Sequence, residues 1–216
     1  MKRQDLLMRY HAAMLEELGP SQWWPGQTTF EIMLGAILTQ NTAWANVEKA
    51  IANLRQADLL EAEALYALPL DRLEELIRPS GFFRLKAQRI RHFLDFLSVS
   101  CAMDLDRLRH EDMASLRDRL LQVQGIGPET ADSILLYALG LPSFVVDAYT
   151  KRILNRHSLV PEDIGYDELR DFFMDALPAD AALFNEFHAL IVRVGKAWCA
   201  RKEGKCPSCP LSRFLG

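Results

Sequence analysis

The stretch that decides the fold is LLQVQGIGPETADSILLYAL, residues 120–139. Two apolar, helix-like runs flank a short turn that contains Gly125 and Gly127. Paired glycines allow backbone conformations closed to other residues and let another backbone come close, and Pro128 suits the first position of a helix. The amides of the two glycines and of the helix start would make an anion site suited to a phosphate. The segment therefore predicts a helix-hairpin-helix, with an ordinary corner between helices as the alternative from the glycines alone.

Outward from the hairpin, apolar residues recur at helical spacing along almost the whole chain. The clearest segments are residues 30–38, 130–139, 149–157, 166–176 and 181–194. Strand patterns are scarce, and we find no internal repeat and no low-complexity linker. These patterns predict an all-α fold, and 216 residues suffice for one compact unit or two small lobes.

The formal net charge of −4 argues mildly against binding to phosphates. Two stretches are nevertheless basic. Residues 78–92 contain five cations and no acid, and the segment from Val192 to the end holds six cations against Glu203. Local patches of this kind are sufficient for a DNA footprint, although solvated helix faces are the simpler interpretation of either stretch alone.

No stretch approaches the roughly 18 apolar residues of a membrane span, and Asp5, Arg9 and His11 interrupt any signal-peptide pattern at the start. We therefore expect a cytoplasmic protein without membrane contact. Three of the four cysteines lie in the last 18 residues. In a reducing compartment this crowding favours a metal site over disulfides.

Several blocks in a fixed order carry a resemblance to a known family. They are Trp23-Trp24-Pro25, MLGAILTQNTAW at 33–44, RPSGFFRLKAQRI at 78–90, the hairpin, and VVDAY at 145–149. Together they resemble the endonuclease III superfamily of DNA glycosylases, and most closely its 3-methyladenine DNA glycosylases. The resemblance covers most of the chain.

The resemblance implies a two-lobed fold with a cleft between the lobes. One helical barrel domain would span residues 28–141 and include the hairpin, and a second would join residues 1–27 to 142–216. It also implies a monomeric enzyme whose partner is double-stranded DNA with a damaged base. Such a base must leave the stack before a side chain can reach it.

Asp147 matches the catalytic aspartate of this superfamily. Loss of a base leaves positive charge on the sugar, which a carboxylate stabilises while it orients or deprotonates the attacking water. The simpler interpretation of Asp147 is a helix N-cap, and one carboxylate can serve both purposes.

Glu129 stands where the superfamily's lyase enzymes carry a lysine, 18 residues before Asp147. A carboxylate cannot form the Schiff base that an amine forms. The resemblance therefore implies a hydrolase without lyase activity. The simpler interpretation of Glu129 is a first-turn acid favoured by the helix dipole, and the two interpretations are compatible.

The remaining site residues fall into two groups. The resemblance and the charge pattern give the DNA-binding candidates Gln40, Asn41, Gly125, Gly127, Lys202 and Lys205. The base-pocket candidates are Trp23, Trp24, Pro25 and Trp44, because an aromatic face attracts a cationic methylated purine. Core packing is the simpler interpretation of any one tryptophan, and a polar helix end is that of Gln40 and Asn41.

Cys199, Cys206 and Cys209 follow C-x6-C-x2-C, and the fourth cysteine of the family's [4Fe–4S] pattern falls on Leu215. Because a cluster normally takes four thiolates, three interpretations stay open. These are a cluster with an unusual fourth ligand, another metal such as zinc, and a remnant that binds nothing.

The sequence thus predicts a glycosylase that hydrolyses the N-glycosidic bond of an alkylated purine such as 3-methyladenine. One rival is an enzyme of the same fold that acts on oxidised pyrimidines or mismatched bases. The other is a helix-hairpin-helix module that binds DNA without catalysis.

Overall fold

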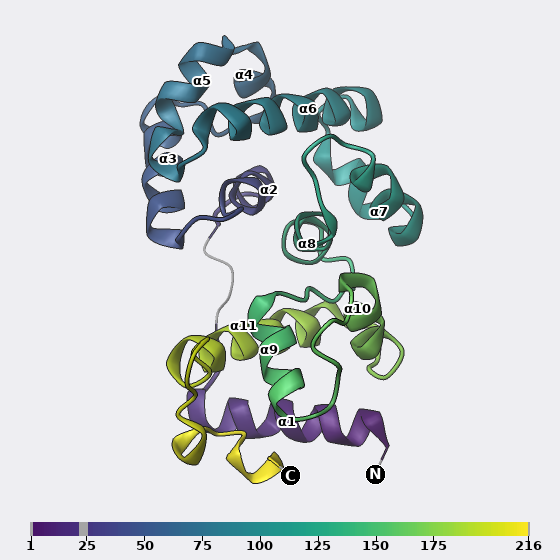
Figure 1. Cartoon of the computed structure of the whole chain (residues 1–216). Helices are drawn as coiled ribbons and strands as arrows, with labels where there is room; N and C mark the ends of the chain where they lie inside the picture. The colour runs from purple at the N-terminus through teal and green to yellow at the C-terminus, as the bar shows by residue number, and fades with distance from the viewer. Residues whose placement is uncertain (1, 22–25, 216) are drawn as a thin grey trace. The chain divides into compact units, whose positions relative to one another are not determined.

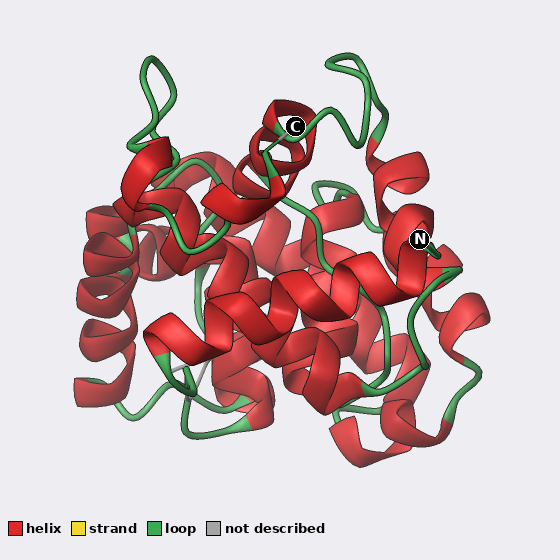
Figure 2. Cartoon of the chain, turned by 90° about the horizontal axis from the view of Figure 1, so that it is seen from below, coloured by secondary structure: helices red, strands yellow, loops and turns green. Residues whose placement is uncertain are grey.

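The computed structural model describes residues 2–21 and 26–215, and these residues form helices joined by loops, with no strand among them (Figure 2). The prediction of an all-α fold is confirmed. The chain divides into two compact units. The hairpin unit is Trp24–Leu141, and the terminal unit joins Met1–Trp23 to Pro142–Gly216. No described helix is long and apolar enough to cross a membrane.

The hairpin unit is built around one apolar core, and Figure 1 shows the helices of this unit. Its helices are α2 (Thr29–Leu38), α3 (Trp44–Gln56), α4 (Ala62–Ala67), α5 (Leu70–Leu76), η1 (Arg78–Ser80), α6 (Phe83–Cys101), η2 (Leu105–His110), α7 (Met113–Leu121), α8 (Pro128–Ser133) and η3 (Ile134–Ala138). Helix α2 packs on α3, α6, α8 and η3, and α6 packs on α4 and α5. Helix α2 is apolar on almost every side, as a central helix must be.

The segment after the hairpin departs from the sequence prediction. Residues 130–139 were expected to form one α-helix, but α8 ends at Ser133 and η3 continues as a π-helix. The amide of Leu139 donates to the carbonyl of Ile134 at 3.2 Å, a wider turn than that of an α-helix. Hydrophobic spacing does not distinguish the two turns, since all five residues of η3 are buried.

The terminal unit consists of α1 (Arg3–Leu18), α9 (Ala148–Arg156), α10 (Tyr166–Met174), α11 (Ala181–Ala197) and the short turns η4 (Cys206–Ser208) and η5 (Ser212–Phe214). Helix α11 packs on α1 and α9. The centre of this unit is aromatic. The Phe144 ring stacks on Phe173 at 4.0 Å between centroids and meets Phe184 and Phe187 edge-on. Phe144 begins the buried run Phe144-Val145-Val146 that leads to Asp147, so this cluster anchors the approach to α9.

Candidate active site

The hairpin turn between α7 and α8 depends on one of its two glycines. Gly125 has φ +95°, and a Cβ built there would lie 2.3 Å from Cγ of Arg89. Gly127 has φ −92° and open space around its Cα, and it caps α8. Ile126 between them is buried, as expected. The turn thus presses its backbone onto α6 at Gly125, which leaves no room for a side chain.

Gln40 holds the hairpin from the end of α2. Its Nε2 donates to the carbonyl of Gly125 at 3.1 Å and to Oγ1 of Thr130 at 2.9 Å, and its Oε1 accepts from Arg89. The neighbouring Asn41 is exposed with φ +52°. Of the two residues predicted to reach into DNA, Asn41 is presented outward. Gln40 would have to break its three hydrogen bonds before its side chain could also point outward.

The basic stretch 78–92 is less available to phosphates than its composition suggests. Arg89 bonds Gln40, and Arg91 donates to the carbonyls of Tyr66 and Leu68. Lys86 is 1% exposed, and its burial, reinforced by the charge of Arg89, lowers its pKa to about 8.

The same stretch presents a residue that the sequence analysis missed. Phe82 is 70% exposed and has φ +46°. Both properties are unfavourable for an aromatic residue outside a binding surface. The signal in the sequence is the Gly81-Phe82-Phe83 run, of which Phe83 lies beneath the guanidinium groups of Arg78 and Arg84.

Trp44 lines a cavity of about 310 Å³ within the hairpin unit. The lining residues, which come from α2, α3 and the segment before α2, are Gly26, Gln27, Glu31, Gly35, Trp44, Glu48, Ile51 and Arg55. The indole Nε1 donates to Oε1 of Glu48 at 2.9 Å, and part of the ring packs on the apolar core. Trp44 therefore combines core packing with a place at a cavity. Trp23, Trp24 and Pro25 lie outside the described residues.

Asp147 is the N-cap of α9 and follows three buried residues, Phe144-Val145-Val146. Its Oδ1 accepts from the amide of Thr150 at 2.8 Å and from the Thr150 hydroxyl at 3.0 Å. Its Oδ2 lies 3.8 Å from Nε2 of His188 on α11. The expected capping role is present, and it uses one oxygen of the carboxylate.

His188 is the second residue that the sequence analysis missed. It is buried on the apolar face of α11, and burial lowers its pKa although Asp147 opposes part of that shift. The lowered pKa favours a neutral imidazole beside Oδ2 of Asp147. The signal in the sequence is a histidine between Phe187 and Ala189, on the face of a helix that otherwise reads as core.

Glu129 is exposed in the first turn of α8, where the helix dipole stabilises an acidic side chain. Lys202 and Lys205 are exposed in the loop that follows α11. Their positions are compatible with contact to DNA, and the predicted roles of these residues stay predictions.

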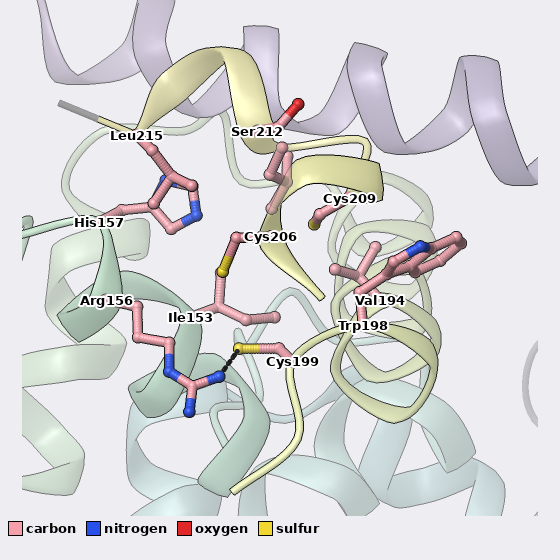
Figure 3. Close-up of a pocket in the computed structure, with 11 residues that line it drawn as sticks. Ile153, Arg156, His157, Val194, Trp198, Cys199, Cys206, Cys209, Ser212 and Leu215 are labelled. Atoms are coloured by element: carbon pink, nitrogen blue, oxygen red, sulfur yellow. Dashed lines mark hydrogen bonds between the residues drawn. The ribbon is translucent and has the colours of Figure 1, made fainter. Parts of the chain in front are cut away.

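The three tail cysteines line one pocket with Leu215, at whose position the family pattern has a fourth cysteine (Figure 3). Arg156 donates from Nη1 to Sγ of Cys199 at 3.2 Å. The cavity left between the side chains is about 20 Å³. Within residues 2–21 and 26–215, no group of three His, Cys, Asp or Glu side chains is arranged to hold a metal ion. The three thiols are thus one short of the four ligands that a [4Fe–4S] cluster normally takes.

Comparison with known proteins gives matches over most of the chain. Residues 34–179 match the HhH-GPD superfamily of base excision DNA repair proteins. A protein of Methanocaldococcus jannaschii, provisionally named a DNA repair glycosylase, is 44% identical over 97% of this chain and 96% of its own length.

Two solved structures give the same fold. The 3-methyladenine DNA glycosylase MagIII of H. pylori, bound to 1,N6-ethenoadenine, is 31% identical with a TM-score of 0.78 over 91% of this chain and 98% of that one. A non-covalent endonuclease III–DNA complex has a TM-score of 0.83 at 23% identity, over 100% of this chain and 96% of that one.

The two hairpin glycines make a matched pair of test positions. Gly125→Ala should lower the free energy of unfolding by roughly 1–3 kcal/mol, because it adds a Cβ at positive φ against Arg89. Gly127→Ala should stay close to the parent protein, since its φ is ordinary and its surroundings are open. Urea unfolding measures both, and equal losses would contradict the assignment of the close approach to Gly125.

Proposed function

Because the chain belongs to the HhH-GPD superfamily of base excision DNA repair proteins, we propose that it is a monofunctional DNA glycosylase. Its reaction is hydrolysis of the bond between an alkylated purine, such as 3-methyladenine, and deoxyribose in double-stranded DNA. The observation that carries the proposal is the Asp147 carboxylate. One oxygen is fixed by Thr150, and the other lies beside the buried His188.

The catalytic step needs a negative charge that stays in place while the base leaves. Departure of the base develops positive charge at the sugar, which Oδ2 of Asp147 would stabilise, and the same oxygen would accept a proton from the attacking water. The two bonds to Thr150 hold the carboxylate in one orientation. Because that geometry exists before substrate binds, little reorganisation is required during the reaction.

Glu129 supports hydrolysis rather than lyase chemistry. Its carboxylate is exposed at the position of the lyase lysine and cannot attack the sugar as an amine. The 3-methyladenine glycosylase among the structural relatives supports an alkylated purine as substrate. The cavity beside Trp44 would receive the base, with the indole face toward the cationic ring.

The DNA contacts proposed for this enzyme are made by the hairpin amides at Gly125 and Gly127, by Asn41, and by the exposed Lys202 and Lys205. The cysteine-rich tail takes no part in the reaction. We infer that its role is packing, in which Arg156 holds Cys199 and Leu215 fills the fourth position.

The function is tested with end-labelled duplexes that each carry one lesion, namely 3-methyladenine, 1,N6-ethenoadenine, an oxidised pyrimidine or a mismatched thymine. Alkali should reveal strand cleavage at the alkylated purine, and without alkali the strand should stay intact. Borohydride added during the reaction should trap no covalent adduct. Release of oxidised pyrimidines alone would overturn the substrate assignment, and a trapped adduct would overturn the monofunctional assignment.

Asp147→Asn tests the catalytic carboxylate. The amide removes the negative charge but keeps an oxygen for the cap, so α9 should stay folded. We expect the single-turnover excision rate to fall by about 10²–10⁴-fold, as for a positioned acid or base, while the Kd for DNA changes little. Thr150→Val, which removes one of the two bonds to Oδ1, serves as a milder control. Wild-type rates for Asp147→Asn on every substrate would remove this residue from the mechanism.

Trp44→Ala distinguishes a base pocket from simple core packing. Loss of stacking, roughly 1–3 kcal/mol per base, should reduce excision of 3-methyladenine more than that of a neutral ethenoadenine. Phe96→Ala is the matched control, because Phe96 is also half-buried against the core of the hairpin unit. Both variants should lower Tm, and only Trp44→Ala should change the ratio of the two rates. An unchanged ratio would assign Trp44 to the core.

A further inference from the structure

Lys86 is a buried cation for which the proposed reaction has no use. Its side chain enters the hairpin unit from the first turn of α6 and is 1% exposed. An ammonium group in such a place is costly unless every proton has an acceptor. The ammonium group therefore must be matched by its surroundings.

Every proton of the Lys86 ammonium group has an acceptor. Nζ donates to the carbonyl of Leu38, to the hydroxyl of Thr42 and to the carbonyl of Ser80, each at 2.7 Å. Three donors meet three acceptors, which is the full capacity of a lysine. The Thr42 hydroxyl in turn donates to the carbonyl of Ser80 at 2.6 Å, so the acceptors are also joined to one another.

These acceptors belong to two segments that are distant in sequence. Leu38 ends α2 next to the loop 39–43, Thr42 lies in that loop, and Ser80 belongs to the segment 78–82. Each segment carries one exposed residue other than glycine at positive φ, Asn41 at +52° in the first and Phe82 at +46° in the second. The two segments are tied together by hydrogen bonds through Nζ of Lys86 and the Thr42 hydroxyl.

We propose that Lys86 is a positioning residue that fixes Asn41 and Phe82 at a set separation, so that the two enter the DNA stack together when the target base leaves it. An exposed apolar side chain can act as a wedge between base steps, and a polar one can occupy the position of the extruded base. If the two loops were not fixed to each other, Asn41 and Phe82 would act separately, and either residue alone would open the duplex less effectively. This role concerns base extrusion. It rests on the proposed function only in the experiments that measure excision.

The test compares Lys86→Met with Lys49→Met, the same change at an exposed lysine of the same unit. Each variant is assayed on the same damaged base opposite a normal partner and opposite an abasic site, where extrusion costs less. Lys86→Met should slow excision from the paired site by about 10–100-fold, and excision opposite the abasic site by less than about threefold. Equal losses on both substrates, or the same pattern in Lys49→Met, would overturn the proposal.

Thr42→Val keeps the test decisive if Lys86→Met fails to fold. It removes one acceptor of Nζ and the bond to Ser80 while preserving the shape of the side chain. The paired-to-unpaired rate ratio should fall by roughly three- to tenfold, as expected for the loss of a hydrogen bond. An unchanged ratio in a folded Thr42→Val protein would contradict the coupling of the two segments.

A readout without excision separates this proposal from the proposed function. Fluorescence of 2-aminopurine beside a tetrahydrofuran abasic analogue reports unstacking in a duplex that cannot be cleaved. The parent protein and Lys49→Met should raise the signal, and Lys86→Met and Thr42→Val should raise it less. If the parent raises it but releases no base, the proposed function fails and the inference about Lys86 stands. Equal signals in all four proteins would overturn the inference.

Discussion

The carboxamide of Gln40 is the interaction on which the hairpin unit depends. It joins the end of α2 to the hairpin backbone, to the first turn of α8 and to Arg89 on α6. These segments are far apart in sequence, and each would otherwise leave a polar group at the edge of an apolar core, where an unsatisfied donor or acceptor is costly. A side chain that has both a donor and an acceptor end can satisfy all three partners at once. The precision of the hairpin is thus set by a residue outside it.

Much of the fold could be predicted from the sequence because it follows from local rules. Apolar spacing identified the helices, the Gly125–Pro128 turn identified the hairpin, and Asp147 was recognised as the start of a helix. The π-helix at Ile134–Ala138 could not be predicted, since an apolar run is compatible with either turn. The family assignment rested on ordered blocks rather than on any single motif, and the comparisons confirm it.

The candidate site was harder to predict, because sequence gives residue types but not the direction of a side chain. The five cations of residues 78–92 appeared to be one basic surface, yet Lys86, Arg89 and Arg91 turn inward to backbone or side-chain acceptors. Long cationic side chains can bury their apolar stems along the protein. The acceptors that their charged ends reach here are brought into place only when segments far apart in sequence meet. Phe82 shows the reverse case, an aromatic residue for which the sequence analysis made no prediction and which is 70% exposed. His188 was missed because a helix face that is apolar in all other positions gives no reason to separate one histidine from the core.

The contact between Gly125 and Arg89 also constrains how this protein can vary. A side chain at position 125 would occupy the space that holds the Arg89 stem, 2.3 Å from a new Cβ. The two positions therefore constrain each other, because an exchange at 125 clashes less only when residue 89 is shorter, and the positive φ of position 125 still disfavours a side chain. A shorter residue 89 would also abandon its bond to Gln40, so the first step along that path already costs stability. A larger residue at 125 and a shorter residue at 89 are thus both unfavourable. Gly127, two residues away, faces open space and carries no such restriction.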